Sequence, residues 1–431
     1  MGKKKPKKVE REKMKEGDTV QSEQFTWRVI KLLGSGGFGD VYKVVKHNHP
    51  DMTESAMKTE MVIGNRLLLR LKIEVVVLMK CHEQTDPEKK SHFVDFVDRG
   101  KTPKFKFLVM GLVGPSLEDI RKKELVRNYS KNTAMQCCIQ TMVAIRDLHG
   151  IGYLHRDIKP QNFAIGLGPK ETTIYMLDFG IARKYTEADN KTVKVPRIKV
   201  HFLGTLRFAS RACHKQLEQG CKDDMECWLY MCFDLFDDDK GLPWKRCERK
   251  QVLEMKEQFF RLEHSSCYRI VPEDFKRLVQ YINGLKYAEL PDYVYLRNSL
   301  AAISKEERVN FSKPLDWAGI TTKKKDKVKE ESGDTDSDIK QQETGSGEKE
   351  EPDRPKSTVS FLISKIVVSA AQKVEVQEAD VKKMRTIFTR VRIFYYLMFL
   401  DTQEFSSNQC GHWLCEKQKS SNDRRSEDTP L

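Results

Sequence analysis

The stretch from Leu154 to Phe163, LHRDIKPQNF, places an aspartate, a lysine and an asparagine in one short loop flanked by apolar residues. Asp157 can accept a proton, Lys159 can neutralise an anionic group, and Asn162 offers an oxygen ligand to a hard metal ion. These groups can take part in catalysis only if the rest of the chain can bind a phosphate group and a metal ion. Otherwise the stretch is no more than a binding loop.

A glycine-rich turn is the first motif that could bind the phosphate. LLGSGGFGDV spaces Gly34, Gly36 and Gly39 as G-x-G-x-x-G, and the missing side chains let peptide N–H groups approach phosphates closely. The turn lies between two apolar stretches, FTWRVIKLLG and DVYKVVKH, that are typical of paired strands. A dinucleotide-binding fold needs a helix after the glycines, so the second strand argues against that fold. A plain glycine-rich hairpin remains the alternative.

Two charged residues follow in apolar surroundings. Lys58 lies on a predicted strand, SAMKTE, and Glu74 lies within a helix predicted over residues 65–80. A carboxylate among valines and leucines is costly to bury unless it is paired. We therefore expect Lys58 to pair with Glu74, which would hold the lysine against the phosphates. An exposed glutamate and a solvated lysine are the alternatives.

The motif TIYMLDFG places Asp178 after a further predicted strand. The ordered set of glycine turn, strand lysine, H-R-D-x-x-x-x-N and D-F-G resembles the signature of protein kinases. In that chemistry Asp157 would orient the attacking hydroxyl and accept its proton, while Lys159 would lie beside the transferred phosphate. Asp178 and Asn162 would hold Mg²⁺ on the phosphates of ATP.

Longer stretches resemble the casein kinase I superfamily, and within it the tau-tubulin kinase-like branch. They include LVMGLVGPSLEDI, HRDIKPQNFAIG, YMLDFGIARKYT, VPRIKVHFLGTLRFAS and CKDDMECWLYM, and the likeness covers about Thr26 to Gly319. The resemblance implies a gatekeeper at Met110, an adenine hinge over 111–113 and an anchoring aspartate at Asp224. It also implies that ATP is bound by Leu33, Gly34, Gly36, Gly39, Val41, Lys58, Met110 and Val113. The A-P-E motif of most kinases is missing, as the family pattern allows.

Members of this superfamily tend to favour acidic or already phosphorylated sites. The predicted activation segment and the residues just after it are rich in cations: Lys184, Lys191, Lys194, Arg197, Lys199, Arg207 and Lys215. Clustered cations beside a substrate groove favour anionic peptides. We therefore expect Lys199 and Arg207 to bind substrate. The alternatives are a solvated basic loop and cations that pair with a phosphothreonine of the kinase itself.

The order of elements, strands first and helices afterwards, predicts an α+β fold with a small β-rich lobe and a larger helical lobe, the bilobal fold of protein kinases. We expect a disordered basic arm over residues 1–24 and a kinase domain over 25–319, with lobes at about 25–110 and 114–319. Residues 320–358 are almost entirely charged or small, which predicts a disordered linker. Residues 359–431 regain hydrophobicity and form an extension of unknown structure.

The composition of this chain of 431 residues indicates which kinds of partner and which cellular compartment to expect. The net charge of +14 suits an acidic partner, such as tubulin or another cytoskeletal protein, but no nucleic-acid-binding module is recognised. Eleven scattered cysteines and the lack of a signal peptide favour the cytoplasm, although KKKPKK could also address the nucleus. We expect no transmembrane segment, and a monomer.

The predicted function is that of a serine/threonine kinase of casein kinase I type that uses ATP and Mg²⁺. The alternative is a pseudokinase or scaffold that binds nucleotide without turning it over.

Overall fold

The computed structural model describes residues 12–36, 39–62, 70–189 and 191–320. The chain divides into two units, Met1–Ser337 and Asp338–Leu431, and all described residues belong to the first. Residues 1–11 of the predicted arm, nearly all of the predicted linker and the whole extension 359–431 lie outside the described residues. None of the helices within the described ranges is both long enough and apolar enough to cross a bilayer.

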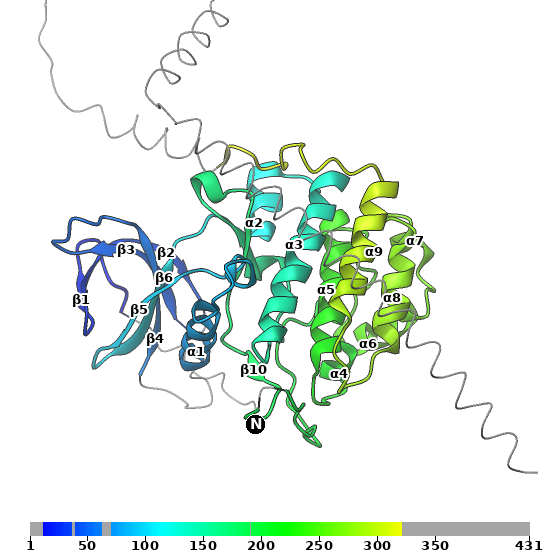
Figure 1. Ribbon diagram of the computed structural model, residues 1–431, viewed down its shortest axis with the longest axis horizontal. Coiled ribbons are helices and arrows are strands. Elements are labelled where there is room, and N and C mark those ends of the chain that lie inside the picture. Colours follow the sequence, from blue (N-terminus) through cyan, green and yellow to red (C-terminus); the bar gives the residue numbers. More distant parts are fainter. Residues whose placement is uncertain (1–11, 37–38, 63–69, 190, 321–431) are drawn as a thin grey trace, which may run out of the picture. The chain divides into compact units, whose positions relative to one another are not determined.

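The smaller lobe is built on a six-stranded antiparallel sheet (Figure 1). In spatial order its strands are β1 (Thr19–Gln21), β2 (Thr26–Ser35), β3 (Asp40–Lys46), β4 (Ser55–Met61), β6 (Phe105–Gly111) and β5 (Phe96–Lys101). Alternate side chains from these strands form one apolar core that includes Trp27, Tyr42 and Phe107, each 1% exposed or less. The hairpin of β2 and β3 and the strand β4 lie where the sequence predicted them.

The ordered chain begins earlier than the sequence predicted. Residues up to 24 were assigned to a disordered arm, but β1 pairs with β2 in the register Val20 to Trp27. Val20 is buried, and the peptide N–H of Met14 donates to the Tyr42 hydroxyl at 3.2 Å. The strand is held by backbone hydrogen bonds and one apolar side chain, which a charge-rich composition does not reveal.

Helix α1 (Leu71–His82) packs against strands β5 and β6. The sequence predicted a helix over 65–80; residues 65–69 of that range lie outside the described residues, and Arg70 is the N-cap. Leu71, Val75 and Leu78 are buried on one side of the helix. The 3-10 turn η2 (Glu88–Lys90) follows before the sheet resumes.

The larger lobe is helical (Figure 1). Helix α5 (Cys221–Phe236) lies at its centre, with every residue except Lys222 buried, and it packs against α3 (Lys131–Gly150) and α8 (Phe275–Gly284). Helix α9 (Tyr293–Glu306) packs on α3. The other helices are α2 (Leu117–Asp119), η3 (Ile120–Leu125), α4 (Arg211–His214), α6 (Arg249–Phe260) and α7 (Ser265–Tyr268).

Short strands and turns between α3 and α4 carry most of the predicted catalytic residues. These elements are β7 (Tyr153–Leu154), η4 (Pro160–Asn162), β8 (Phe163–Ile165), η5 (Gly168–Lys170), β9 (Ile174–Met176) and β10 (Arg183–Lys184). Strand β7 pairs with β10, and β8 pairs with β9. The two pairings place the loop 155–162 and the segment that begins at Asp178 side by side.

Candidate active site

The glycine-rich turn is closely packed on the strand that carries Lys58. Gly34 pairs with Val41 across the hairpin, and the N–H of Gly36 donates to the carbonyl of Gly39 at 2.9 Å. A Cβ atom at Gly39 would lie only 1.6 Å from the carbonyl oxygen of Thr59 on β4. Glycine is therefore required at position 39 for packing. Residues 37 and 38 of the turn lie outside the described residues.

Lys58 and Glu74 form the ion pair that the sequence predicted. The Lys58 Nζ lies 2.7 Å from Glu74 Oε2 and 2.9 Å from Asp178 Oδ1. The Glu74 side chain is 2% exposed, whereas that of Asp178 is about half exposed. The ammonium thus links a strand, a helix and the D-F-G turn, and it brings together three residues that are far apart in the chain.

The electrostatics of this trio keep the lysine charged. Burial alone would lower the pKa of Lys58, but Glu74 and Asp178 raise it above its usual value. Burial raises the pKa of Glu74, while Lys58 acts against that shift. Burial would likewise raise the pKa of Asp178, but the neighbouring ammonium of Lys58 holds it below its usual value. The exposed carboxylate of Asp178 is therefore ionised at neutral pH.

Glu60 is a positioning residue that the sequence reasoning missed. Its Oε1 accepts hydrogen bonds from the peptide N–H groups of Arg70 at 2.5 Å and Leu71 at 3.1 Å. These groups stand at the start of α1, whose N-cap side chain makes no capping bond. Strand β4 therefore carries Lys58 and also caps the helix that carries Glu74. Residues two apart on a strand face the same side, so the sequence could place Glu60 beside Lys58 but not against the start of the helix.

The loop after β7 holds Asp157 between two donors. Lys159 Nζ lies 2.6 Å from Asp157 Oδ2, and the Thr205 hydroxyl donates to Asp157 Oδ1 at 2.8 Å. The same Lys159 Nζ donates to the Thr205 hydroxyl oxygen at 2.9 Å. Asn162 donates through Nδ2 to the carbonyl of Asp157 at 2.8 Å, so this bond leaves the amide oxygen of Asn162 unused. Thr205 was not predicted, although it lies within the quoted stretch FLGTLRFAS.

The backbone of this loop is anchored on α5. Asp224 accepts hydrogen bonds from the peptide N–H groups of His155 at 2.7 Å and Arg156 at 2.8 Å. His149 Nε2 lies 2.9 Å from the same carboxylate. Burial alone would raise the pKa of Asp224, but the hydrogen bond from His149 and its charged neighbours lower it. This is the anchoring position that the family resemblance implied.

A cavity of about 660 Å³ lies between the glycine turn, α1 and the loop 155–162. Its lining includes every residue predicted to bind ATP or metal: Leu33, Gly34, Gly36, Gly39, Val41, Lys58, Met110, Val113, Asn162 and Asp178. Glu74 also lines it, whereas Asp157 and Lys159 lie outside the lining. Within the described residues, Leu112 and Val113 make no backbone hydrogen bond to another peptide group. Their peptide groups are therefore available to a bound molecule.

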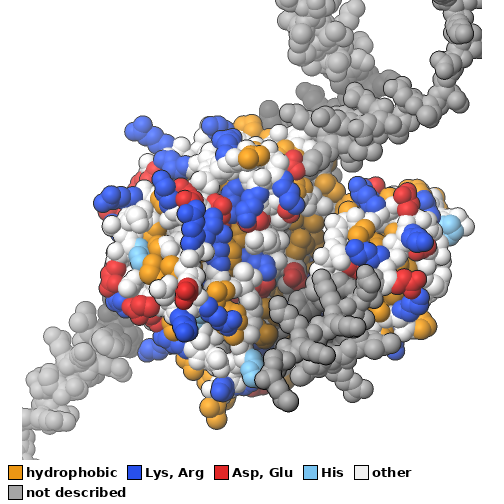
Figure 2. All heavy atoms as spheres, turned by 180° about the vertical axis from the view of Figure 1, so that it is seen from behind, with side chains coloured by type: hydrophobic (Ala, Val, Ile, Leu, Met, Phe, Trp, Pro, Cys, Tyr) orange, Lys and Arg blue, Asp and Glu red, His pale blue; other side chains and the backbone are white. Residues whose placement is uncertain are grey.

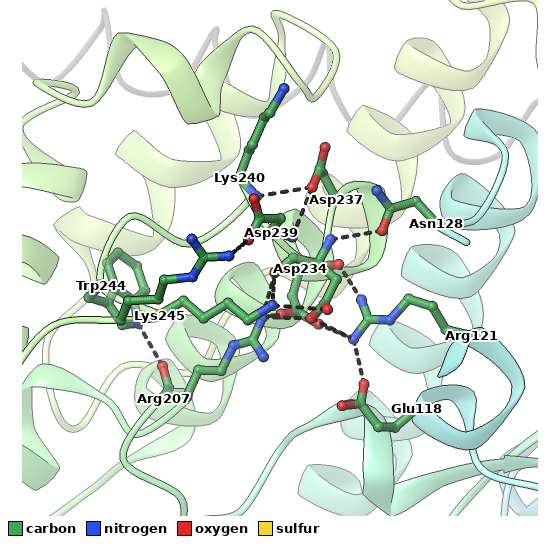
Figure 3. A network of polar contacts seen from close by, with 12 residues as sticks. Glu118, Arg121, Asn128, Arg207, Asp234, Asp237, Asp239, Lys240, Trp244 and Lys245 are labelled. Carbon is green, nitrogen blue, oxygen red and sulfur yellow. Dashed lines mark hydrogen bonds and ion pairs between the residues drawn. The ribbon is translucent and has the colours of Figure 1, made fainter. Parts of the chain in front are cut away.

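Arg207 lies in an internal ion-pair network and not on a free surface (Figure 3). Its guanidinium pairs with the buried carboxylate of Asp234 and, at 3.1 Å, with Asp238 Oδ1. Arg121 binds the same two aspartates at 3.0 and 3.2 Å, and Lys245 Nζ lies 2.9 Å from Asp238 Oδ2. The network joins the segment after Thr205 to α5. The prediction that Arg207 binds substrate is therefore not supported, because its cation is already neutralised.

Other predicted substrate contacts divide into paired and unpaired cations. Arg197 pairs with Glu218, and Lys215 Nζ lies 2.6 Å from Glu257 Oε1. Lys199 is exposed and makes no ion pair with any residue in the described ranges. Figure 2 shows Lys and Arg side chains spread over one face of the helical lobe with carboxylates between them. That distribution is mixed, and it does not form a purely basic patch.

The chain matches the protein kinase domain family over residues 27–268. It is 37% identical over 297 residues to a putative serine/threonine-protein kinase of Caenorhabditis elegans, ZK507.3, covering 68% of this chain and 74% of that protein. It is 39% identical over 272 residues to a second one, ZK507.1, covering 63% and 80%. The serine/threonine-protein kinase spe-6 of the same organism is 34% identical over 304 residues, covering 69% and 76%. The predicted bilobal α+β fold is confirmed, and the chain belongs to the protein kinase family, with serine/threonine kinases as its relatives.

Proposed function

We propose that the protein is an active kinase that transfers the γ-phosphate of ATP to serine or threonine hydroxyls of proteins. The observation that carries the proposal is the contact of one ammonium, that of Lys58, with both Glu74 and Asp178. A protein that only binds nucleotide has no need of a carboxylate pair around this lysine. The alternative, a pseudokinase or scaffold, would be favoured by damage to Lys58, Asp157 or Asp178, and all three are present.

The residues present fit ATP and Mg²⁺. The cavity has room for a nucleotide, its apolar wall includes Val41 and Met110, and the glycine turn forms one end. Asp178 presents a half-exposed carboxylate, and the amide oxygen of Asn162 is left unused by its hydrogen bond to Asp157. Carboxylate and amide oxygens suit Mg²⁺, which would neutralise phosphate charge when bound. These two residues would hold it.

Asp157 would act on the substrate hydroxyl. Phosphoryl transfer depends chiefly on the position of the nucleophile and on charge stabilisation. Lys159 and Thr205 each hold one carboxylate oxygen of Asp157, which fixes the orientation of that side chain. A carboxylate fixed in this way can align a hydroxyl and accept its proton. Lys159 is placed to offset charge that develops on the transferred phosphate.

We further propose that the enzyme belongs to the casein kinase I type, closest to the tau-tubulin kinase-like branch, and favours acidic sites. The support is the family resemblance together with four cations that make no ion pair within the described residues: Lys184, Lys191, Lys194 and Lys199. Arg207 does not contribute to this support. Acidic cytoskeletal proteins such as tubulin are proposed partners, and the cytoplasm, with the nucleus as a second site, is the proposed location.

Transfer of radiolabelled phosphate from ATP to a protein with acidic serine and threonine sites tests the activity. The wild-type protein should label the substrate, and Asp157→Asn should reduce the rate by about three orders of magnitude while nucleotide binding is retained. The opposite result is a wild-type protein that binds ATP, as shown by a thermal shift, but labels the substrate no more than Asp157→Asn does. That result would show that the protein is a pseudokinase.

A further inference from the structure

A fully buried lysine holds the chain immediately after Thr205. Lys256 on α6 is 0% exposed, and its Nζ donates to the carbonyl oxygens of Leu206 at 3.1 Å and Ala209 at 2.5 Å. His214 Nε2 lies 3.2 Å from the same nitrogen. An ammonium has three N–H donors, so these three atoms can accept all of them.

The surroundings allow His214 to be an acceptor. Burial, followed by the repulsion from Lys256, lowers the pKa of His214 to about 4. Its ring is therefore neutral at pH 7 and has one nitrogen free to accept. The ring of Tyr230 lies 4.7 Å from the Lys256 Nζ and that of Trp244 lies 5.4 Å from it, which adds cation–π attraction.

This arrangement is costly for stability. No carboxylate within the described ranges lies at ion-pair distance from Lys256. Burial lowers the pKa of Lys256 to about 7, and the nearby carboxylate of Glu226 only partly opposes that shift. A buried charge without an ionic partner is strongly unfavourable. A methionine of similar length would fill the same space without that penalty, so packing alone does not account for a lysine here.

The segment that Lys256 holds is next to the proposed catalytic aspartate. The carbonyl of Thr205 accepts from the N–H groups of Phe208 and Ala209, both at 2.9 Å, so residues 205–209 form one tight turn. Lys256 binds the carbonyls near its start and at its end. At the other side of the turn, the hydroxyl of Thr205 holds Asp157.

Two further contacts fix the same segment to the helical lobe. Trp244 Nε1 donates to the carbonyl of Arg207 at 2.8 Å, and the N–H of Arg211 donates to Glu226 Oε1 at 2.6 Å. The chain lacks the glutamate of the A-P-E motif at this point. In its place, side chains from α5, α6 and the loop before α6 bind the backbone directly. Among the side chains that the structure describes, Lys256 alone binds two carbonyls of the turn.

We propose that Lys256 is a positioning residue that fixes the turn 205–209 so that Thr205 keeps Asp157 aligned with the substrate hydroxyl. This inference rests on the proposed kinase function. It assigns Lys256 no contact with ATP or substrate. Its loss should therefore affect the peptide reaction and leave the nucleotide cavity intact, because α6 packs against α4 and α8, whereas Lys58 and Glu74 lie on β4 and α1.

The test is Lys256→Met in the full-length protein, measured at pH 6.5. We expect kcat for a peptide substrate to fall between about ten- and a hundredfold, as misplacement of a reacting group commonly does. The KM for ATP should stay within about twofold of wild type, and the melting temperature should not fall. Loss of activity without loss of stability is a result that a purely structural role does not give.

Leu300→Ala on α9 is the control, since Leu300 is fully buried and its truncation leaves a cavity. If Lys256→Met also lowers the melting temperature, urea is added to the more stable of the two variants until both are equally destabilised. An equal fall in kcat in both variants overturns the proposal, and so does a Lys256→Met kcat within twofold of wild type. A much smaller fall in the control supports it.

Amide hydrogen exchange separates this inference from the kinase proposal, because it needs no activity. Lys256→Met should speed exchange of the N–H groups of residues 208 and 209 at least tenfold, while helix α1 exchanges as in wild type. Unchanged exchange at the turn overturns the positioning role. If amide exchange at the turn becomes faster but the wild-type protein transfers no phosphate, the kinase proposal fails. The inference that Lys256 holds the turn 205–209 then still stands.

Discussion

Replacing Arg207 distinguishes a structural cation from a substrate-binding one. Arg207→Ala removes one of the two guanidinium groups that neutralise Asp234, whose side chain is 0% exposed. Breaking a buried ion pair by removing one partner costs about 3–5 kcal/mol. Arg121 remains 3.0 Å from Asp234, and the Arg207 side chain is 19% exposed, so the loss should lie at or below the lower end of that range. We expect a loss of about 2–3 kcal/mol, which is roughly 4–10 °C in melting temperature for a domain of this size.

The loss should depend on pH in a defined direction. Burial, partly opposed by Arg121 and Arg207, raises the pKa of Asp234 to about 6 in the folded protein. Below that pH the folded protein protonates Asp234, and the missing cation matters less. The destabilisation by Arg207→Ala should therefore be largest near pH 7.5 and shrink as the pH falls through 6 towards 5. Scanning calorimetry at several pH values measures it.

The substrate assay completes this test. Rates are compared for two peptides that differ only in acidic residues near the target serine. Arg207→Ala should lower both rates by the same factor, because Arg207 is neutralised internally, and Arg207→Ala with Asp234→Asn should recover part of the stability. An unchanged melting temperature together with a selective loss on the acidic peptide would show that Arg207 binds substrate and that the reasoning from its ion pairs is wrong.

Three further predictions concern the cavity and the buried lysine. Gly39→Ala should raise the Kd for ATP at least tenfold, because its Cβ would meet the Thr59 carbonyl at 1.6 Å. Titration with a fluorescent nucleotide measures this Kd, and Gly284→Ala, where a Cβ meets open space, is the control. Glu74→Gln should lower kcat/KM about a hundredfold but change unfolding stability by no more than about 1 kcal/mol. A carboxylate that is costly to bury is removed, and Lys58 keeps Asp178 as its ionic partner at 2.9 Å. Additive effects of Glu74→Gln and Lys58→Met would contradict the coupling. The pKa of Lys256 is lowered to about 7 in the folded protein, so its penalty on stability is full below pH 7 and fades as the pH rises towards the unfolded value of about 10.5. The stability advantage of Lys256→Met over wild type in urea unfolding should therefore shrink from pH 6.5 to pH 9.5, and a constant or growing advantage would contradict it.

The sequence predicted the cavity well because its motifs are local and their spacing is tied to strands and turns. Lys58, Asn162 and Asp178 are each next to a strand whose apolar pattern is readable, so their convergence followed from the order of elements. Glu60 was not recognised, because capping a helix that begins ten residues later is a long-range contact. Thr205 escaped for the same reason, since its partner Asp157 is 48 residues earlier in the chain.

The sequence reasoning did not anticipate the ion pairs of Arg207, because a sequence shows cations but not their partners. Asp234 and Asp238 lie about thirty residues further on, and nothing in their spacing identifies them as partners of this arginine. Lys256 shows the opposite case. A lysine in a polar helix such as RKQVLEMKEQFF reads as a solvated charge, and only the packing of the helix on the turn 205–209 reveals that it is buried.

Pairing also limits how strong a preference for acidic substrates can be. Of the cations in and just after the activation segment, Arg197, Arg207 and Lys215 are neutralised by carboxylates. The remaining four make no ion pair in the described ranges: Lys184, Lys191, Lys194 and Lys199. Exposed lysines contribute only about 0–1 kcal/mol per contact, and salt screens that contribution.

The proposed preference should therefore be modest and sensitive to salt. We expect the ratio of kcat/KM for the acidic and neutral peptides to be roughly ten at 50 mM salt and to approach one at 0.5 M. The double variant Lys191→Ala, Lys199→Ala should already show a kcat/KM ratio near one at 50 mM salt. A ratio that resists both salt and the double variant would require a buried, preorganised anion site, which none of these exposed lysines can provide.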